Sequence, residues 1–336
     1  MITKTEVICS TSNNPYHNIA LEEYLLNSVD SETVILYLWQ NKQTVVIGQN
    51  QNAWQECKVK ELEEDGGHLA RRLSGGGAVF HDLGNLNFTF LVPRKEYDVA
   101  KQSDVIRVAA ASYGLDVERT GRNDILIGGR KFSGNAFFKR GDTAYHHGTI
   151  LISSDMKKLS QYLNVSKAKL ESKGVQSVSA RVANLTDFCK DVTIEGMKER
   201  LTEALSVVYG IAPRIMTEEE CDQKEIKRLE EKFESWEWRF GKKIPFQIEF
   251  GEKFPWGEIS IQLAVESGVI TDAAVYSDAM DSFFISKVAD AIKGQKYSSE
   301  ALKTALSGVE LDTEFDYEAG PQLIEDIKTL ISKQNF

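Results

Sequence analysis

The alternation of apolar and polar residues predicts short strands and helices from the start of the chain. Tyr16, Ala20 and Tyr24 recur every four residues after Asn13-Asn14-Pro15, a polar cap followed by proline, so a helix with one core-facing side begins there. The apolar runs 34–39 and 44–47 are typical of strands that are buried on both faces.

The middle of the chain continues this pattern, with strands separated by glycine turns. We expect strands at 78–80, 86–92, 115–119, 125–127 and 149–152, and helices at 98–113, 194–209 and 217–233. The aromatic run 235–240 reads as a further strand. Short strands and turns flanked by helices indicate a mixed α/β (α+β) sheet rather than regular βαβ units.

A domain boundary is expected near 241–243. Beyond it, Ile259, Ile261 and Leu263 alternate with Ser260 and Gln262 up to a glycine turn, which indicates a hairpin, and three helical patterns follow. We expect a large domain at 1–243 and a small C-terminal α+β domain at 250–336.

Composition narrows the classes of function. The 336 residues carry 40 basic and 50 acidic side chains, a net charge of −10, which argues against a nucleic-acid binder. No apolar run is long enough to span a bilayer and the N-terminus lacks the apolar core of a signal peptide, so no membrane partner is expected. The four cysteines are widely separated and are interpreted as reduced thiols in a cytoplasmic protein.

Two glycine-rich stretches carry the candidate chemistry. In 71–90, Gly75-Gly76-Gly77 follows an arginine pair, and amides without Cβ atoms can face an anion, although a plain tight hairpin fits this stretch equally well. The second stretch, 121–149, contains GRND, GGRKFSGNA and HHG. His146 and His147 are adjacent, so on a strand they face opposite sides and cannot bind one metal together. No P-loop and no GxGxxG pattern is present, and we expect no structural metal.

Together these stretches closely resemble the lipoate–protein ligase family, whose patterns are RRxSGGGAVxHDxGN, GRND…GRKxSGxA and HHG. The resemblance runs nearly end to end and includes Asn184-Leu185 and the SWEW run at 235–238. It implies a biotin/lipoyl protein ligase-like catalytic domain at 1–243 with an accessory domain at 250–336. It also implies that lipoic acid is activated by ATP as lipoyl-AMP, with release of pyrophosphate, and passed to a lysine of a lipoyl-domain protein. Acceptors of this kind are 2-oxoacid dehydrogenase E2 subunits and the glycine cleavage H protein.

Lys131 is the expected catalytic residue. A carboxylate attacking the α-phosphate of ATP brings two anions together, and an ammonium between them would stabilise the transition state. Most lysines are simply exposed, and only the motif around Lys131 reverses that preference. The resemblance assigns the other contacts: ATP or adenylate to Arg72, Gly77, Ala78, Val79, Phe80 and Lys131, and lipoate to Gly75, Gly76, Lys131 and His147.

Asn123 and Asp124 are the expected Mg²⁺ and pyrophosphate residues, because an oxygen-rich turn suits a hard cation. A simple Asx turn explains this pair almost as well. The lysine- and serine-rich segment 164–184 resembles the adenylate-binding loop of the family, and we expect it to close over a ligand. A solvated linker is nearly as consistent with its composition.

Two other functions remain open from the sequence. The first is a cofactorless octanoyl or lipoyl transferase that works through a cysteine thioester, although none of the four cysteines lies in either motif. The second is a non-catalytic binder of lipoyl proteins in which Lys131 is structural.

Overall fold

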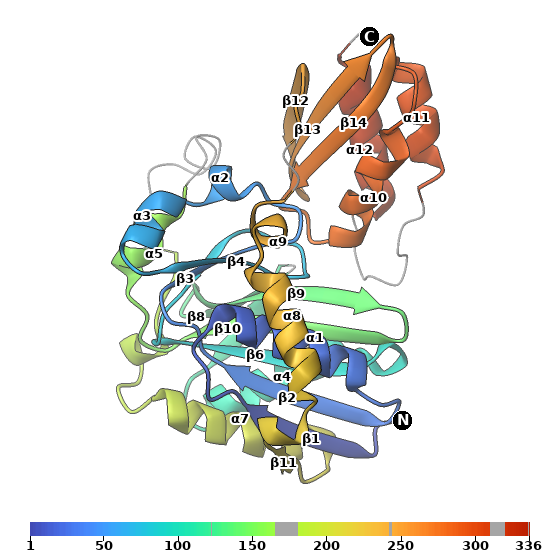
Figure 1. Ribbon diagram of the computed structural model, residues 1–336. Coiled ribbons are helices and arrows are strands. Elements are labelled where there is room, and N and C mark those ends of the chain that lie inside the picture. Colours follow the sequence, from blue (N-terminus) through green and yellow to red (C-terminus); the bar gives the residue numbers. More distant parts are fainter. Residues whose placement is uncertain (122, 165–180, 242–243, 310–319, 335) are drawn as a thin grey trace. The chain divides into compact units, whose positions relative to one another are not determined.

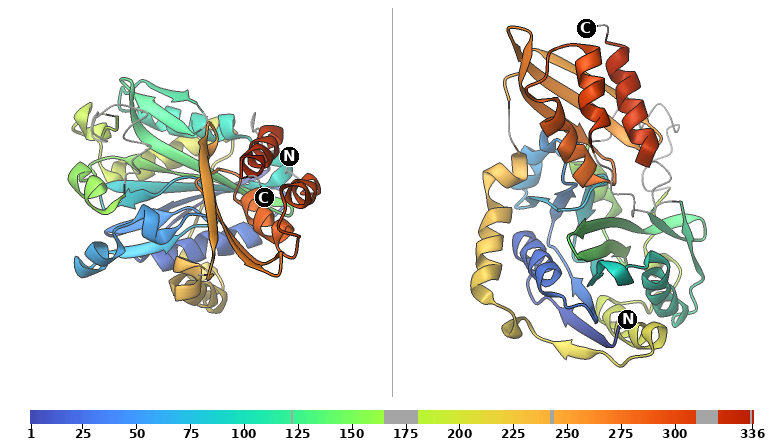
Figure 2. Two further views of the ribbon diagram at one scale, coloured as in Figure 1. Left: turned by 90° about the horizontal axis from the view of Figure 1, so that it is seen from above. Right: turned by 90° about the vertical axis from the view of Figure 1, so that its right-hand side faces the viewer.

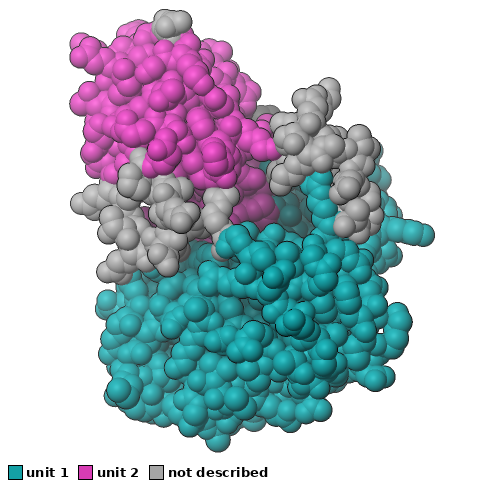
Figure 3. Space-filling view, turned by 180° about the vertical axis from the view of Figure 1, so that it is seen from behind, with its two compact units in different colours: residues 1–46, 56–71, 78–239 teal, residues 47–55, 72–77, 240–336 magenta. Residues whose placement is uncertain are grey.

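The computed structural model describes residues 1–121, 123–164, 181–241, 244–309, 320–334 and 336 (Figure 1). The backbone contacts divide the chain into two units, which are coloured separately in Figure 3. Unit 1 comprises Met1–Val46, Glu56–Arg71 and Ala78–Arg239, and unit 2 comprises Ile47–Gln55, Arg72–Gly77 and Phe240–Phe336. The glycine turn at 72–77 therefore groups with the C-terminal residues, although the strands that precede and follow it belong to unit 1.

A mixed sheet of eight described strands forms the centre of unit 1 (Figure 1). β1 is parallel to β2 and β11, and the remaining neighbours pair antiparallel, which confirms the expected mixed α/β class. The spatial order is β11 (Arg214–Met216), β1 (Lys4–Cys9), β2 (Thr33–Trp39), β6 (Asn85–Pro93), β10 (Thr143–Leu151), β9 (Arg130–Arg140), β8 (Asp124–Ile127) and β7 (Val117–Thr120).

A second, three-stranded sheet contains the strands that precede and follow the first glycine motif's turn in the sequence. Its order is β4 (His68–Arg71), β3 (Thr44–Ile47) and β5 (Val79–His81). All four residues of β3 are buried, as are all seven of β2, so the expectation of strands buried on both faces is confirmed.

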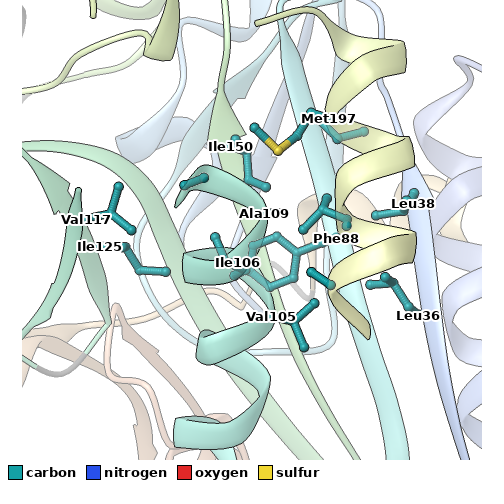
Figure 4. Close-up of a cluster of buried hydrophobic side chains, with 14 of the residues drawn as sticks. Leu36, Leu38, Phe88, Val105, Ile106, Ala109, Val117, Ile125, Ile150 and Met197 are labelled. Atoms are coloured by element: carbon teal, nitrogen blue, oxygen red, sulfur yellow. The ribbon is translucent and has the colours of Figure 1, made fainter. Parts of the chain in front are cut away.

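Helices cover both faces of the eight-stranded sheet. On one face lies α1 (Pro15–Ser28), which starts where the sequence predicts: the Asn14 side chain accepts a hydrogen bond from the Tyr16 amide at 2.9 Å. On the other face, α4 (Val99–Ala111) and α7 (Ile194–Tyr209) pack Val105, Ile106 and Met197 against Phe88 of β6 in a continuous apolar core (Figure 4). Strand alternation decides which side chains each face receives.

The remaining short elements connect these layers. They are α2 (Ala53–Glu56), α3 (Val59–Glu64), η1 (Arg94–Glu96), α5 (Met156–Tyr162), η3 (Leu185–Asp187), η4 (Glu218–Glu220), α8 (Gln223–Glu234) and α9 (Trp236–Phe240). Most of the expected loop at 164–184 lies outside the described residues, because 165–180 are not among them.

The expectation of a strand at 235–240 is wrong, because Trp236–Phe240 forms the helix α9. The hydroxyl of Ser235 accepts a hydrogen bond from the Trp238 amide at 3.2 Å, and the Ser235 carbonyl accepts one from the Arg239 amide. A serine that caps a helix start thus overrides the strand preference of the aromatic residues that follow it.

The C-terminal part of unit 2 has the expected small antiparallel sheet, with three helices among the described residues. β12 (Ile248–Phe254), β13 (Gly257–Glu266) and β14 (Val269–Ser277) carry α10 (Ser282–Ile292), α11 (Ser299–Ser307) and α12 (Gly320–Ser332) on one face (Figure 2). Ile259, Ile261 and Leu263 are buried in this core, as their alternation predicts. Among the residues that the structure describes, no helix combines the length and the apolar character needed to cross a bilayer.

Candidate active site

Lys131 lies near the start of β9 and is held by several contacts. Its Nζ atom is 2.6 Å from the Asp124 carboxylate, and the lysine side chain is one third exposed. Its backbone N–H donates to the Arg181 carbonyl at 2.8 Å, and its carbonyl accepts from the Ala183 amide at 2.9 Å. Arg181 and Ala183, in the described part of the segment 164–184, therefore form backbone hydrogen bonds with Lys131, the expected catalytic residue.

Gly134 leaves the space that the Lys131 side chain fills. A Cβ atom at position 134 would lie 2.8 Å from both Cε and Nζ of Lys131. Gly134 pairs with Asp124 across the strands, so the ammonium, the carboxylate and this glycine form one local arrangement. The amine is thus held against the sheet by an anion rather than directed freely into solvent.

His147 lies on the α1 face of the sheet and joins a buried polar chain. Its Nδ1 atom is 2.8 Å from Oε1 of Glu22, which also accepts from the Thr89 hydroxyl at 2.7 Å. The Thr89 hydroxyl in turn accepts from the indole N–H of Trp39 at 3.1 Å. Glu22 is fully buried, and its Oε2 atom has no hydrogen-bond partner among the described residues.

The sequence interpretation missed Glu22, although a signal was present. Ile19, Glu22 and Leu26 follow the three- and four-residue spacing of the core stripe of α1, and all three are buried. A carboxylate at a core position of a helix costs free energy unless it has partners, and this indicates a polar function or network.

His146 points to the opposite face, as predicted for adjacent residues of a strand. Burial, followed by the nearby charges of His147 and Arg119, lowers the pKa of His146 to about 3. The ring is therefore neutral at any pH near 7. Its Nε2 lies 2.8 Å from Oδ1 of Asn135, and its Nδ1 lies 3.2 Å from Oε1 of Gln102.

We expect acid to destabilise the fold through His146. The folded pKa is about 3 and an unfolded histidine titrates near 6.5, so between these values the unfolded chain binds the extra proton. The free energy of unfolding therefore falls as the pH is lowered through this window, by up to about 1.4 kcal/mol per pH unit. Urea unfolding from pH 7 to pH 4 measures the slope, and His146→Gln should reduce it. An unchanged slope in that variant would contradict the assignment.

Asn123 and Asp124 are engaged separately in the structure. The Asn123 side-chain N–H donates to the Asn135 carbonyl at 3.2 Å, whereas the Asp124 carboxylate contacts Lys131. No cluster of three or more His, Cys, Asp or Glu side chains suited to a metal occurs in the described part of the chain. Mg²⁺ at a nucleotide site needs only one or two carboxylates beside the substrate phosphates, so the Mg²⁺ role of Asn123 and Asp124 stays a prediction.

The glycine turn in unit 2 contacts residues 279–280. A Cβ atom on Gly75 would lie 2.2 Å from the Ala279 carbonyl oxygen and 2.5 Å from that of Met280. The Gly76 amide donates to the Ala279 carbonyl at 3.1 Å, and Gly76 has a positive φ of 85°. A Cβ atom on Gly77 would meet open space. Close approach of another backbone explains the glycine at position 75, and its expected lipoate contact stays a prediction.

The two adjacent arginines have different partners. Arg72 is 6% exposed, and its guanidinium donates to the carbonyls of Gly75 at 2.7 Å and Gly77 at 2.8 Å, which braces the turn. Arg71 donates to the carbonyls of Trp238 and Arg239 at the end of α9. Arg72 is thus the arginine that shapes the glycine turn.

The three residues after the turn belong to unit 1. Ala78 and Val79 are partly exposed, whereas Phe80 is buried and lies with its ring 5.6 Å from that of Tyr162. The backbone and side chains of Ala78 and Val79 are accessible to a ligand, and Phe80 supports the strand from beneath.

Comparison with known protein families identifies the class of this fold, a biotin/lipoyl ligase-like catalytic domain followed by a C-terminal domain with a small antiparallel sheet. Residues 14–206 match the family model of the lipoyl protein ligase A/B catalytic domain, and residues 243–331 match that of the bacterial lipoate protein ligase C-terminus. The chain belongs to the lipoate–protein ligase family.

Individual relatives agree with this assignment. Lipoate-protein ligase A of Psychrobacter cryohalolentis is 38% identical over 308 residues, which cover 89% of this chain and 91% of that protein. LipL1 of P. falciparum, solved in complex with lipoate, has a TM-score of 0.85 at 28% identity and covers 98% of this chain and 99% of its own.

Two further solved structures match the larger part of the chain. A bipartite lipoate protein ligase of Thermoplasma acidophilum, described with its E2 lipoyl domain, has a TM-score of 0.63 at 28% identity and covers 72% of this chain and 99% of its own. A lipoate-protein ligase A bound with ATP has a TM-score of 0.61 at 26% identity and covers 72% and 99%. The recognition of the family from its motifs is confirmed.

Proposed function

We propose that this protein is an ATP-dependent lipoate–protein ligase in which Lys131 is the catalytic residue of lipoate activation. The observation that carries the proposal is the 2.6 Å ion pair between Lys131 and Asp124 inside the family motif. The contact holds an ammonium inside the motif, and a fixed positive charge is what adenylation requires.

Lys131 neutralises the two anions of the first half-reaction. The lipoate carboxylate and the α-phosphate of ATP repel each other, and an ammonium between them lowers this repulsion as the mixed anhydride forms and pyrophosphate leaves. When the substrates bind, their oxygens replace Asp124 as partners of the ammonium. Asp124 thus holds the ammonium in place between catalytic cycles.

ATP and lipoate contacts follow from the two glycine-rich motifs. Arg72, Gly77, Ala78, Val79 and Phe80 take the nucleotide or adenylate, and Gly75, Gly76, Lys131 and His147 take lipoate. Relatives solved with lipoate and with ATP support both substrates. Asn123 and Asp124 would help to hold the Mg²⁺ that accompanies the ATP phosphates, because oxygen ligands suit this hard cation.

The acyl chain extends along the α1 face of the sheet. His147 lies on that face, and so does Gly134, beneath Lys131, because Gly134 and Ala136 share one side of β9 and Ala136 pairs with His147. The Glu22–Thr89–Trp39 chain closes this side with buried groups. A low-dielectric surface there would favour the neutral form of the acceptor lysine in the second half-reaction.

The acceptor is a lipoyl-domain protein, such as an E2 subunit of a 2-oxoacid dehydrogenase or the glycine cleavage H protein. The Thermoplasma acidophilum ligase described with its E2 lipoyl domain supports this class of partner. The domain limits 1–243 and 250–336 are supported by the two family models, which match 14–206 and 243–331. Free thiols at Cys9, Cys57, Cys189 and Cys221 support a cytoplasmic location.

Three of the four cysteines do not support the thioester mechanism. Burial raises the pKa of Cys57 to about 12 and that of Cys221 to about 11, and it raises the pKa of Cys9 as well. A nucleophilic cysteine requires a lowered pKa, so these thiols are inert by that criterion.

Incubation with lipoate, ATP and an apo lipoyl domain, followed by intact mass measurement, tests the function. We expect one lipoyl group per acceptor, only when ATP is present and with release of pyrophosphate. Acylation without ATP that is lost after thiol alkylation would establish the thioester transferase instead. An acceptor that binds but remains unmodified, without pyrophosphate release, would establish a non-catalytic binder.

A further inference from the structure

His146 has no part in the chemistry proposed above, yet it occupies a costly position. It is fully buried, and the rings of Phe88, Phe90 and Phe137 lie 5.3, 6.0 and 5.1 Å from its own. An apolar side chain would fill such a site without the desolvation that an imidazole requires. The two hydrogen-bond contacts of the ring therefore indicate that His146 does more than fill the core.

Its partners determine which ring nitrogen carries the hydrogen. The Asn135 side-chain N–H already donates to the Asn123 carbonyl at 3.0 Å, so the Asn135 oxygen is left to accept from His146 Nε2 at 2.8 Å. A neutral imidazole has one donor and one acceptor. Nδ1 lies 3.2 Å from Oε1 of Gln102, whose Nε2 has no hydrogen-bond partner among the described residues, so turning this amide by 180° satisfies both groups: the Gln102 N–H donates and Nδ1 accepts. The Nε2–H of His146 thus donates to Asn135 on β9, and its Nδ1 accepts from Gln102 on α4.

Asn135 passes this constraint to the turn before β8. Three hydrogen bonds join Asn135 and Asn123: backbone N–H to carbonyl at 2.8 Å, Asn135 side chain to the Asn123 carbonyl at 3.0 Å, and Asn123 side chain to the Asn135 carbonyl at 3.2 Å. Asn123 is followed by Asp124, and Asn135 is preceded by Gly134, over which Lys131 lies. Asn123 and Asn135 are therefore the chain neighbours of Asp124 and Gly134, the two residues that contact the Lys131 ammonium group.

We propose that His146 is a positioning residue for lipoate activation, which acts from the far face of the sheet through Asn135 and Asn123 to hold Asp124 against Lys131. This inference rests on the proposed catalytic role of Lys131. The constraint passes along hydrogen bonds: His146 Nε2–H fixes the Asn135 amide, that amide fixes Asn123, and Asn123 sets the direction of the adjoining Asp124 carboxylate.

The kinetic test compares the loss of the His146–Asn135 hydrogen bond with the loss of the His146–Gln102 hydrogen bond. His146→Phe keeps the ring volume and removes the bond to Asn135, and we expect kcat for lipoyl-AMP formation to fall about tenfold or more, with KM for lipoate within about twofold. Gln102→Met removes only the bond on the α4 side and should leave kcat within about twofold, although it too costs stability. His146→Gln supplies an amide N–H near the position of Nε2 and should restore most of the rate.

Three results would overturn the inference: a wild-type rate in folded His146→Phe, an equal loss of kcat in Gln102→Met, or an Nδ1–H tautomer in the ¹⁵N spectrum of the wild-type ring. Should His146→Phe fail to fold, Asn135→Asp replaces it, because it keeps the acceptor for His146 and loses the N–H to Asn123. An unchanged kcat there overturns the inference as well. A wild-type enzyme that releases no pyrophosphate from lipoate and ATP would instead refute the proposed function, and this inference with it.

Discussion

Replacement of Lys131 by alanine is expected to abolish lipoyl-AMP formation, with a loss of kcat on the order of a thousandfold or more. The variant removes the ammonium that lies 2.6 Å from Asp124, and the two substrate anions then meet without that cation between them. The fold should persist, because the ion pair is about one third exposed and such pairs contribute less than about 1 kcal/mol. Chromatographic measurement of lipoyl-AMP and of released pyrophosphate gives the result directly.

Lys139→Ala provides the matched control for Lys131→Ala. Lys139 lies on the same strand, and its Nζ contacts the Tyr97 ring at 5.1 Å from the centroid. Its removal should leave the rate of adenylate formation within about twofold, because no substrate charge depends on it. Substantial adenylate synthesis by Lys131→Ala, or an equal loss in Lys139→Ala, would contradict the proposed mechanism.

Gly75→Ala is expected to cause a large loss of stability, whereas Gly77→Ala in the same turn should cause little. The new methyl group at position 75 would meet the carbonyl oxygens of Ala279 and Met280 at 2.2 and 2.5 Å, distances that only a backbone shift can relieve. Overpacking of this kind costs about 1–3 kcal/mol. A methyl group at position 77 has open space.

Thermal and urea unfolding of the two alanine variants measure this difference. Hydrogen exchange of the Gly76 amide, which donates to the Ala279 carbonyl, gives a local readout and should accelerate only in Gly75→Ala. Equal unfolding midpoints for the two variants would show that residues 279–280 do not constrain the turn in solution.

The sequence contained enough information for the elements whose signals are local. The Asn14 cap and Pro15 predicted the start of α1, and the alternation of Ile259, Ile261 and Leu263 predicted the face of β13 that is buried. The opposite faces of His146 and His147 followed from strand geometry alone. Motif spacing then identified the family.

Long-range contacts account for what the sequence could not reveal. Arg71 and Arg72 look equivalent along the chain, but Arg71 bonds carbonyls 167 and 168 residues away, whereas Arg72 bonds carbonyls three and five residues away. The helix at 236–240 was missed because its capping serine competes with three strongly strand-forming aromatic residues. Glu22 was missed because its partners, Thr89 and His147, lie far along the chain.

The parallel pairing of β1 with β11 has a consequence for synthesis on the ribosome. Glu6 lies opposite Arg214 and Ile8 opposite Met216, so the outer edge of β1 has no partner until more than 200 further residues have been translated. At about 5–20 residues per second this takes roughly 10–40 s. During that interval the nascent chain presents an unpaired β-strand edge, the kind of surface that recruits other unfinished chains, so the last strand of the sheet also ends the period in which aggregation competes with folding.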